Sequence, residues 1–329
     1  MPDLTTARQF WIRAPGHGEI VRADLAPRHA DDVLIRTRYS AVSRGTESLI
    51  FRGEVPASQH EAMRAPFQEG QFPGPVKYGY VSVGEVVDGP GQGPNDLTGR
   101  LVFCLFPHQD LYCVPADRVT RIPDDVPAGR AVLAANMETA VNVLWDARPA
   151  AGDRIVVIGA GVVGLLVAWL CRHTPGASVT VVDVNPSRDA IARELGLAFR
   201  TEAPRDANAD LVIHASGQPA GLASALTAAG IEGTIVEASW YGTRSVPLPL
   251  GEHFHSRRLT LRSSQVGRLP PDRVPRWDFQ RRMMLALDLL RDPRLDSLIT
   301  GESAFEDLPD VLAKLSSDPD GALCHRIRY

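Results

Sequence analysis

The pattern of hydrophobic and polar positions changes character near residue 130. Before that point, short apolar runs are separated by stretches rich in glycine and proline. These runs predict strands over residues 33–38, 81–87, 101–106 and 111–114. The first part of the chain is therefore expected to be β-rich with long loops. Residues 55–75 show no clear periodicity, and we expect a loop or a short helix over a site there.

From residue 130 onward, helical and strand-like segments alternate. A stretch with few helix breakers predicts a helix over residues 131–147. Strands are then expected over 154–158, 178–182, 198–200, 210–214, 233–238 and 259–262, with helices over 162–173, 187–195 and 219–228. Continuous apolar strands alternating with helices are typical of a parallel sheet covered on both faces. The chain is expected to end with helices over 279–291 and 308–315 and a strand over 324–328.

The strongest motif is Gly-Ala-Gly-Val-Val-Gly at residues 159–164, which follows an apolar strand and opens an apolar helix. Gly159 allows a tight turn, Gly161 lets the backbone approach a pyrophosphate, and Gly164 lets the helix pack close to the strand. A pyrophosphate bound there lies at the positive end of the helix. The motif predicts a dinucleotide site that includes Val162 and Val163. The alternative is a plain strand–turn–helix with incidental glycines.

Asp183 bears on which dinucleotide is bound. It ends the second apolar strand, about 20 residues after the motif, where a carboxylate accepts hydrogen bonds from the adenosine ribose hydroxyls. A carboxylate also repels a 2′-phosphate, so NAD(H) is favoured over NADP(H). Arg188, five residues further on, either complicates this preference or is a solvated helix residue.

Composition and charge exclude several classes of protein. The chain has 329 residues, 44% hydrophobic and 22% charged, which is typical of about two globular domains. A net charge of −4 provides no basic surface for nucleic acid. The longest apolar run is short and interrupted by glycines, so no membrane span or membrane partner is expected. Four cysteines without a Cys-x-x-Cys pair favour a reducing, cytoplasmic location.

The order of these parts resembles the medium-chain dehydrogenase/reductase superfamily. Three motifs agree with its patterns: GRLVF at 99–103, GDRIVVIG at 152–159 and DLVIHASG at 210–217, which is similar to the family's DvviEasG. The resemblance covers essentially the whole chain. It implies an α/β fold in which a GroES-like β-rich catalytic domain (1–139 and 269–329) flanks a doubly wound Rossmann domain (140–268). It also implies an NAD(P)-dependent dehydrogenase in which Ser216 and Ser239 contact the cofactor.

The zinc ligands of that family are largely replaced. Where zinc members have a cysteine and a histidine, this chain has Arg44 and Tyr80, and only Glu138 matches a ligand. One oxygen ligand cannot hold a catalytic zinc ion, which needs three protein ligands. The four-cysteine structural lobe is missing too, so we expect no zinc. The stretches SRGTES, GYVSVG and FPHQ are similar to a zinc-lacking branch, the bacteriochlorophyllide hydroxyethyl dehydrogenases.

Without zinc, another group must polarise or protonate the substrate oxygen. Tyr80 can donate a proton and Arg44 can stabilise the oxygen charge. Alternatively, Tyr80 packs in a wall and Arg44 forms an ion pair with Glu47 or Glu138. Glu138 can also act as a base if burial raises its pKa.

Further residues are expected near the site. Thr46 stands where zinc members relay a proton, unless it only packs in a strand or turn. The expected lining of the substrate pocket is Glu47, His108 and Trp240. His108 is otherwise a surface loop residue, and Trp240 a dimer contact.

Three functions remain open at this stage. The first is an NAD(H)-dependent oxidoreductase that interconverts a secondary alcohol and a carbonyl of a small molecule. The second is a zinc-free quinone or enoyl reductase acting on a C=C bond, and the third is an inactive coenzyme-binding or sensing protein. A homodimer is expected, because the open edge of the Rossmann sheet needs a partner or a cover.

Overall fold

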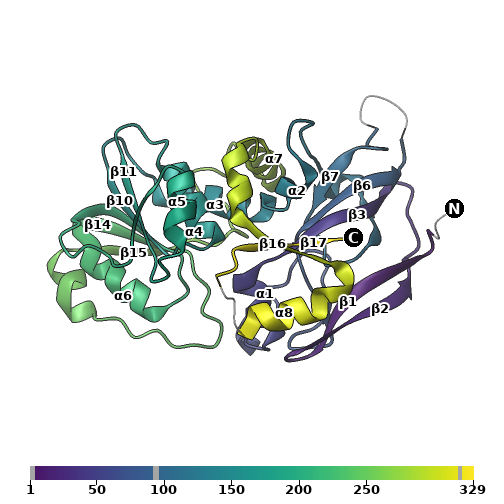
Figure 1. Cartoon of the computed structure of the whole chain (residues 1–329), viewed down its shortest axis with the longest axis horizontal. Helices are drawn as coiled ribbons and strands as arrows, with labels where there is room; N and C mark the ends of the chain where they lie inside the picture. Colours follow the sequence, from purple (N-terminus) through teal and green to yellow (C-terminus); the bar gives the residue numbers. More distant parts are fainter. Residues whose placement is uncertain (1–3, 92–95, 318–320) are drawn as a thin grey trace. The chain divides into compact units, whose positions relative to one another are not determined.

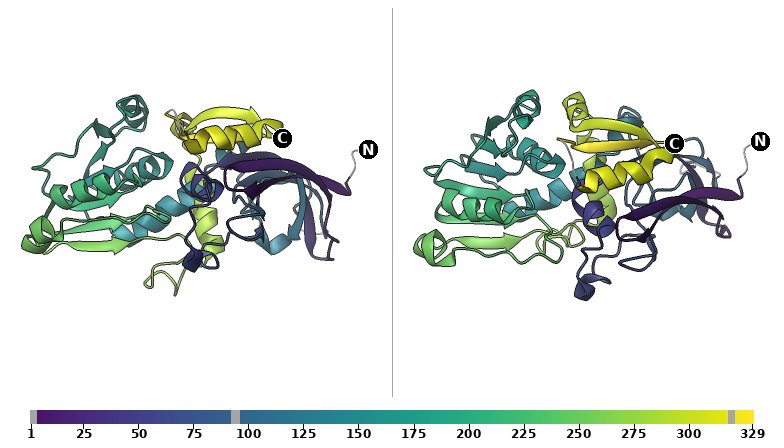
Figure 2. Two further views of the ribbon diagram at one scale, coloured as in Figure 1. Left: turned by 90° about the horizontal axis from the view of Figure 1, so that it is seen from below. Right: turned by 60° about the horizontal axis from the view of Figure 1, so that its bottom comes forward.

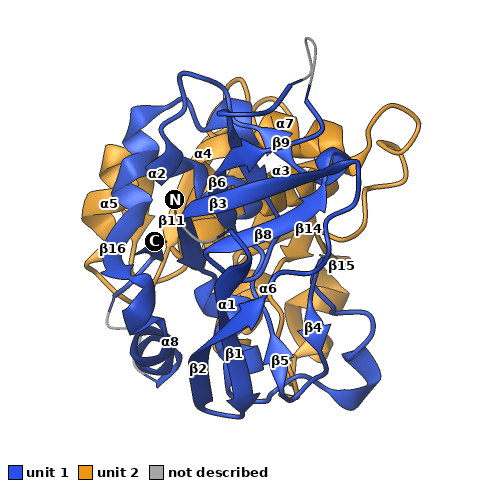
Figure 3. Cartoon of the chain, turned by 90° about the vertical axis from the view of Figure 1, so that its right-hand side faces the viewer, with its two compact units in different colours: residues 1–135, 287–329 blue, residues 136–286 orange. Residues whose placement is uncertain are grey.

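The computed structural model describes residues 4–91, 96–317 and 321–329 and divides the chain into two compact units (Figure 3). Unit 1 comprises Met1–Ala135 and Leu287–Tyr329, and unit 2 comprises Asn136–Ala286. The domain limits expected from the sequence were 139/140 and 268/269. In the structure, residues 136–139 and 269–286, which this prediction places in the first domain, group with unit 2.

Unit 1 is built on two sheets. One has the strand order β2-β1-β5-β4 and the other β16-β17-β3-β6-β7-β9, with β8 paired to β3. The strands are β1 (Thr6–Ala14), β2 (His17–Asp24), β3 (Asp32–Val42), β4 (Glu69–Gly70), β5 (Val76–Lys77), β6 (Ser82–Asp88), β7 (Leu101–Cys104), β8 (Leu111–Pro115), β9 (Thr120–Arg121), β16 (Ile299–Ala304) and β17 (Cys324–Arg328). Except for the parallel pair β16 and β17, the strand pairs are antiparallel.

The helices of unit 1 are short. They are α1 (Arg44–Phe51), α2 (Ala128–Ala131) and α8 (Leu308–Ser317), with 3-10 turns η1 (Ala57–Gln59), η2 (Ala116–Arg118), η4 (Pro293–Leu298) and η5 (Phe305–Asp307). Helix α8 lies beside α1 and β2, so the end of the chain completes the domain that its beginning forms (Figure 2). The segment over 55–75, expected to be a loop or short helix, contains only η1 and β4.

Unit 2 contains one sheet of six parallel strands, β12-β11-β10-β13-β14-β15. The strands are β10 (Arg154–Ile158), β11 (Ser178–Val182), β12 (Ala198–Arg200), β13 (Ala209–His214), β14 (Ala229–Glu237) and β15 (Thr260–Ser263). Helices α4 (Val162–Cys171), α5 (Arg188–Glu194) and α6 (Pro219–Ala228) lie against it (Figure 1). Four of the five residues of β10 are buried, as continuous apolar strands in a covered parallel sheet require. The predicted Rossmann fold is confirmed.

Two helices lie where the chain passes from one unit to the other. Helix α3 (Ala134–Ala147) leads into unit 2, and α7 (Phe279–Leu289) leads out of it, with the short turn η3 (Leu250–Phe254) in between. The single helix expected over 131–147 is wrong in one respect, since α2 ends at Ala131 and a two-residue turn precedes α3. The sequence has neither glycine nor proline at this break, so local preference does not predict it.

The glycine motif forms the strand–turn–helix that its spacing predicts. Gly159 has a φ of +108°, and a Cβ added there would lie 2.6 Å from the backbone nitrogen of Ser216. A Cβ on Gly164 would lie 1.9 Å from the carbonyl oxygen of Gly159. Gly161 caps α4 and has no atom within 4 Å of its added Cβ. The first and third glycines are thus demanded by packing, whereas the second leaves space at the helix N-terminus.

We predict that Gly164→Ala destabilises unit 2 because its methyl group would overlap the carbonyl of Gly159. The expected loss of unfolding free energy is about 1–3 kcal/mol, the cost of overpacking. Gly161→Ala is the matched control and is expected to cost less, at most about 1 kcal/mol, because its position is open and only the poor helix-capping preference of alanine acts there. Denaturant unfolding of both variants checks this, and equal stabilities would contradict it.

Candidate coenzyme and catalytic sites

Asp183 is held at the glycine turn of unit 2. It directly follows β11, and its Oδ2 accepts a hydrogen bond from the backbone N–H of Ala160 at 2.7 Å. Its Oδ1 accepts from the N–H of Asn185 at 2.9 Å. The carboxylate therefore lies beside the turn that would receive a pyrophosphate. Arg188, for which a solvated position was one expectation, is only 5% exposed at the start of α5.

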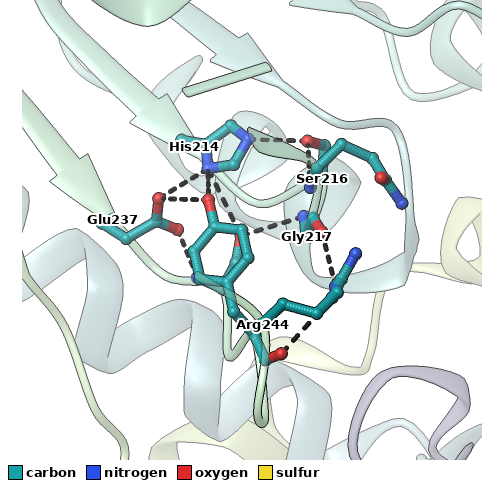
Figure 4. Close-up of polar contacts among 8 residues, drawn as sticks. His214, Ser216, Gly217, Glu237 and Arg244 are labelled. Carbon is teal, nitrogen blue, oxygen red and sulfur yellow. Dashed lines mark hydrogen bonds and ion pairs between the residues drawn. The ribbon is translucent and has the colours of Figure 1, made fainter. Parts of the chain in front are cut away.

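A second polar network joins the carboxyl ends of β13 and β14 (Figure 4). His214, the last residue of β13, lies opposite Glu237, the last residue of β14, in the parallel register. The His214 Nδ1 and the Glu237 Oε2 are 2.8 Å apart, and the His214 Nε2 and the Ser216 Oγ are 2.6 Å apart. Tyr241 donates to the same Glu237 oxygen at 3.0 Å.

Ser239 links the two loops that follow these strands. Its N–H donates to Glu237 Oε1 at 2.6 Å, and its Oγ accepts from the N–H of Gly217 at 3.0 Å. Arg244 donates to the carbonyl of Gly217 at 2.9 Å. Ser216 and Ser239, both expected cofactor contacts, therefore belong to one network at the sheet edge, and Trp240 follows it, partly buried.

In unit 1, Tyr80 lies just before β6, and its side chain contacts the residue that precedes α1. Its hydroxyl donates to the Ser43 Oγ, and the N–H of Ser43 donates to the Glu47 Oε1 at 2.8 Å. Burial raises the pKa of Tyr80 to about 12, helped by the negative charge of Glu47. Hydrogen bonds between Tyr80 and the side chains of Ser43 and Thr46 lower the pKa and so act in the opposite direction. Tyr80 is therefore a neutral phenol at physiological pH.

His108 is buried, contrary to the alternative of a surface loop residue. It is 1% exposed, its Nε2 is 2.9 Å from the Glu47 Oε2, and its Nδ1 is 2.8 Å from the Ser40 Oγ. The Ser40 Oγ lies 3.0 Å from the Tyr329 hydroxyl. Tyr80, Ser43 and Glu47 are thus continuous with a buried polar chain that reaches the C-terminal residue.

Arg44 and Glu138 make separate contacts. Arg44 begins α1, and its Nη1 donates to the carbonyl of Ala322 at 3.1 Å. Glu138 in α3 pairs with Arg282 of α7, whose Nε lies 3.1 Å from the Glu138 Oε1. Burial raises the pKa of Glu138, although the charge of Arg282 opposes this. Arg282 also donates to the Asn142 side chain.

The described residues contain neither a cluster of metal ligands nor a membrane-spanning helix. In the ranges given above, no group of three or more His, Cys, Asp or Glu side chains is arranged to hold a metal ion. None of the described helices is both long enough and apolar enough to cross a membrane.

Sequence reasoning missed several of these residues. His214 stands where the quoted family motif DvviEasG has glutamate, a substitution that signals altered chemistry at the sheet edge. Glu237 and Ser43 carry no such signal, because only the parallel register and the turn into α1 bring them to their partners.

Comparison with proteins of known sequence finds dehydrogenases. The chain is 24% identical over 316 residues to a D-guloside 3-dehydrogenase from Escherichia coli K12, covering 88% of each chain. It is 26% identical over 229 residues to an uncharacterized zinc-type alcohol dehydrogenase-like protein from Haemophilus influenzae. That match spans 65% of this chain and 63% of the relative's length. No family model matches the chain.

Solved structures share the whole fold. An alcohol dehydrogenase from Escherichia coli CFT073, complexed with NADH, superposes with a TM-score of 0.76 at 17% identity, covering 99% of this chain and 100% of its own. A zinc-binding dehydrogenase from Sinorhizobium meliloti 1021, bound to NADP, reaches 0.78 at 16% identity with the same coverage. The chain therefore has the medium-chain dehydrogenase fold, with relatives among the zinc-type alcohol dehydrogenase-like proteins, as the sequence motifs predicted.

We predict that Tyr80 remains protonated well above the pH at which a free tyrosine ionises, near 10. Its neutral form is favoured in the folded protein, so this group stabilises the fold below pH 10 and loses that effect as pH rises through about 12. The tyrosinate absorbance of the protein minus that of Tyr80→Phe is expected to stay flat below about pH 11. A step near pH 10 in this difference would contradict the assignment.

Proposed function

We propose that this chain, with its medium-chain dehydrogenase fold, is an NAD(H)-dependent oxidoreductase that interconverts a secondary alcohol and a carbonyl without catalytic zinc. The observation that carries the proposal is the Asp183 carboxylate bound to the glycine turn of the parallel sheet. Dinucleotides bind at this place in such sheets, with an acidic residue on the ribose hydroxyls. The relatives named above support a dehydrogenase but differ in the coenzyme their structures contain.

The residues of unit 2 fit a dinucleotide. The space beside Gly161 and the N-terminus of α4 suit a pyrophosphate, and Asp183 suits a ribose that carries free hydroxyls. When bound, the nicotinamide ring would supply or accept the hydride. The chain itself must then handle the proton and the charge on the substrate oxygen.

The side chains at the expected zinc positions do not fit a zinc ion. The Arg44 guanidinium has no lone pair to offer, Tyr80 is a neutral phenol, and Glu138 is already paired with Arg282. We therefore assign no step to a metal.

Tyr80 is the proposed proton donor. A phenol held neutral can give its proton to a carbonyl oxygen during reduction, but it is a poor base for the reverse direction. The Ser43 hydroxyl, which accepts from Tyr80, is placed to exchange a proton with it. Arg44, one residue further along the chain, supplies a positive charge for the developing alkoxide. The site therefore favours carbonyl reduction.

The coenzyme preference is the first test. We expect NADH to bind more tightly than NADPH by roughly 1–3 kcal/mol. Asp183 repels a 2′-phosphate, and a phosphorylated 2′-oxygen can no longer donate a hydrogen bond to the carboxylate. Asp183→Ala is expected to narrow the difference in affinity between the two coenzymes, mainly by weakening NADH binding. Asp189→Ala, which removes a half-exposed α5 carboxylate paired with Arg193, is the matched control. Calorimetric titration with both coenzymes decides, and tighter NADPH binding by the unmodified protein would overturn the preference.

The proton donor is the second test. Tyr80→Phe is expected to lower kcat by about 10²–10⁴-fold, the usual contribution of general acid catalysis, while NADH affinity stays unchanged. Tyr39→Phe, which alters a ring packed under Arg326, is the control. The assay is NADH oxidation with a panel of ketones and of enones in the presence of a chelator.

The panel separates the possible functions. If only enones are turned over, the protein is a C=C reductase and the proposed alcohol–carbonyl function is wrong. Loss of ketone turnover in the presence of the chelator would indicate that the reaction requires a metal ion. An unchanged kcat for Tyr80→Phe would return Tyr80 to a packing role.

A further inference from the structure

The network at the ends of β13 and β14 is built around one carboxylate. Glu237 accepts three hydrogen bonds, from Tyr241, from the N–H of Ser239 and from His214. The His214 and Tyr241 rings are nearly parallel, with an interplanar angle of 13°. The His214 side chain is fully buried. These contacts fix the imidazole in one orientation, as the close-up shows (Figure 4).

This orientation sets the hydrogen-bond polarity of Ser216. A carboxylate only accepts, so the nitrogen facing Glu237, Nδ1, must carry the proton. In the neutral imidazole Nε2 is then an acceptor and takes the hydroxyl proton of Ser216. The Ser216 Oγ also accepts from the N–H of Gln218 at 3.2 Å. The Ser216 hydroxyl proton is thus bound to His214, and the Ser216 Oγ can offer a ligand only a lone pair.

Ser216, His214 and Glu237 also have the connectivity of a serine hydrolase triad. Hydrolysis further needs N–H donors for an oxyanion beside the nucleophile. The N–H of Gly217 donates to Ser239, and that of Gln218 donates to Ser216 itself. The two amides that follow the serine are therefore occupied, and the triad lacks the donors that attack by Ser216 would require.

The strand order places this network on the nicotinamide side. Strand β10 carries the glycine turn and has β11, with Asp183 after it, on one side and β13 on the other. If the adenosine ribose lies at Asp183, the other half of the dinucleotide extends over the ends of β13 and β14. Ser216 follows β13 and is only partly buried.

We propose that His214 is a positioning residue that makes Ser216 a hydrogen-bond acceptor for a donor group on the nicotinamide half of the coenzyme. That donor is a ribose hydroxyl or the carboxamide amino group. The inference rests on the proposed function, since it assumes that the dinucleotide binds at this edge. His214 stands where the motif has glutamate. A neutral histidine can donate to Glu237 and at the same time accept the hydroxyl proton of Ser216, whereas an ionised glutamate can only accept.

The test measures binding rather than turnover. His214→Leu and Ser216→Ala are each expected to weaken NADH binding by about 3- to 10-fold, the effect of one hydrogen bond. ADP, which lacks the nicotinamide half, is expected to bind all variants equally. The double variant is expected to be no weaker than the single ones, because both remove the same interaction. His173→Leu, just beyond the C-terminal end of α4, is the control.

The outcomes distinguish this inference from the proposed function. If the unmodified protein binds neither NADH nor NADPH, the proposed function fails. If it binds NADH but His214→Leu binds NADH as tightly, only the inference fails. Additive losses in the double variant, or an equal loss of ADP binding, would also overturn it, because His214 would then act independently or only structurally.

Two further probes complete the test. With 3-acetylpyridine adenine dinucleotide, in which a methyl group replaces the amino group, an abolished Ser216→Ala effect identifies the carboxamide as the donor and a retained effect identifies the ribose. Either result supports the acceptor role. A fluorophosphonate is expected to leave Ser216 unlabelled, and stoichiometric labelling would overturn the positioning role in favour of a nucleophile.

Discussion

The parallel register of β10 with its two neighbours is the constraint on which the coenzyme side depends. Ile158, the last residue of β10, pairs with Val182 and with His214, and His214 pairs with Glu237. Because parallel strands end at one edge, the turn after each strand meets the turns after its neighbours. A slip of one residue would move His214 to the other face of its strand and separate it from Glu237.

One carboxylate organises the polar residues in each unit: Glu47, which is buried, and Glu237, which is partly buried. Glu47 in unit 1 bonds to Ser43 and His108, and Glu237 in unit 2 bonds to Ser239, Tyr241 and His214. An isolated buried charge is costly, so each carboxylate is stable only with several donors around it. The donors are in turn held in one orientation. Each carboxylate thus fixes the orientation of the neighbouring hydroxyl groups, because it requires their hydrogen bonds to be stable away from water.

Much of the fold was predictable because its signals are local. The predicted strands over 154–158 and 178–182 have their observed bounds, since continuous apolar runs between turns leave few alternatives. The break between α2 and α3 was not predictable, because no glycine or proline marks it. Asp183 directly follows the second strand of the sheet, as its spacing predicts. His108 lies in a loop, as expected, but its burial against Glu47 was not predictable, because the two residues are far apart in the chain.

The sequence by itself determined the order of elements, the glycine turn and the carboxylate after the second strand of the Rossmann sheet. These follow from periodicity and from spacings of a few residues, which short-range sterics enforce. Only the tertiary structure decided which polar side chains are hydrogen-bonded to one another. The pairs His214–Glu237 and His108–Glu47 join residues far apart in the chain, so they exist only once strand register and loop packing have placed both partners. The polar contacts at both candidate sites depend on such pairs.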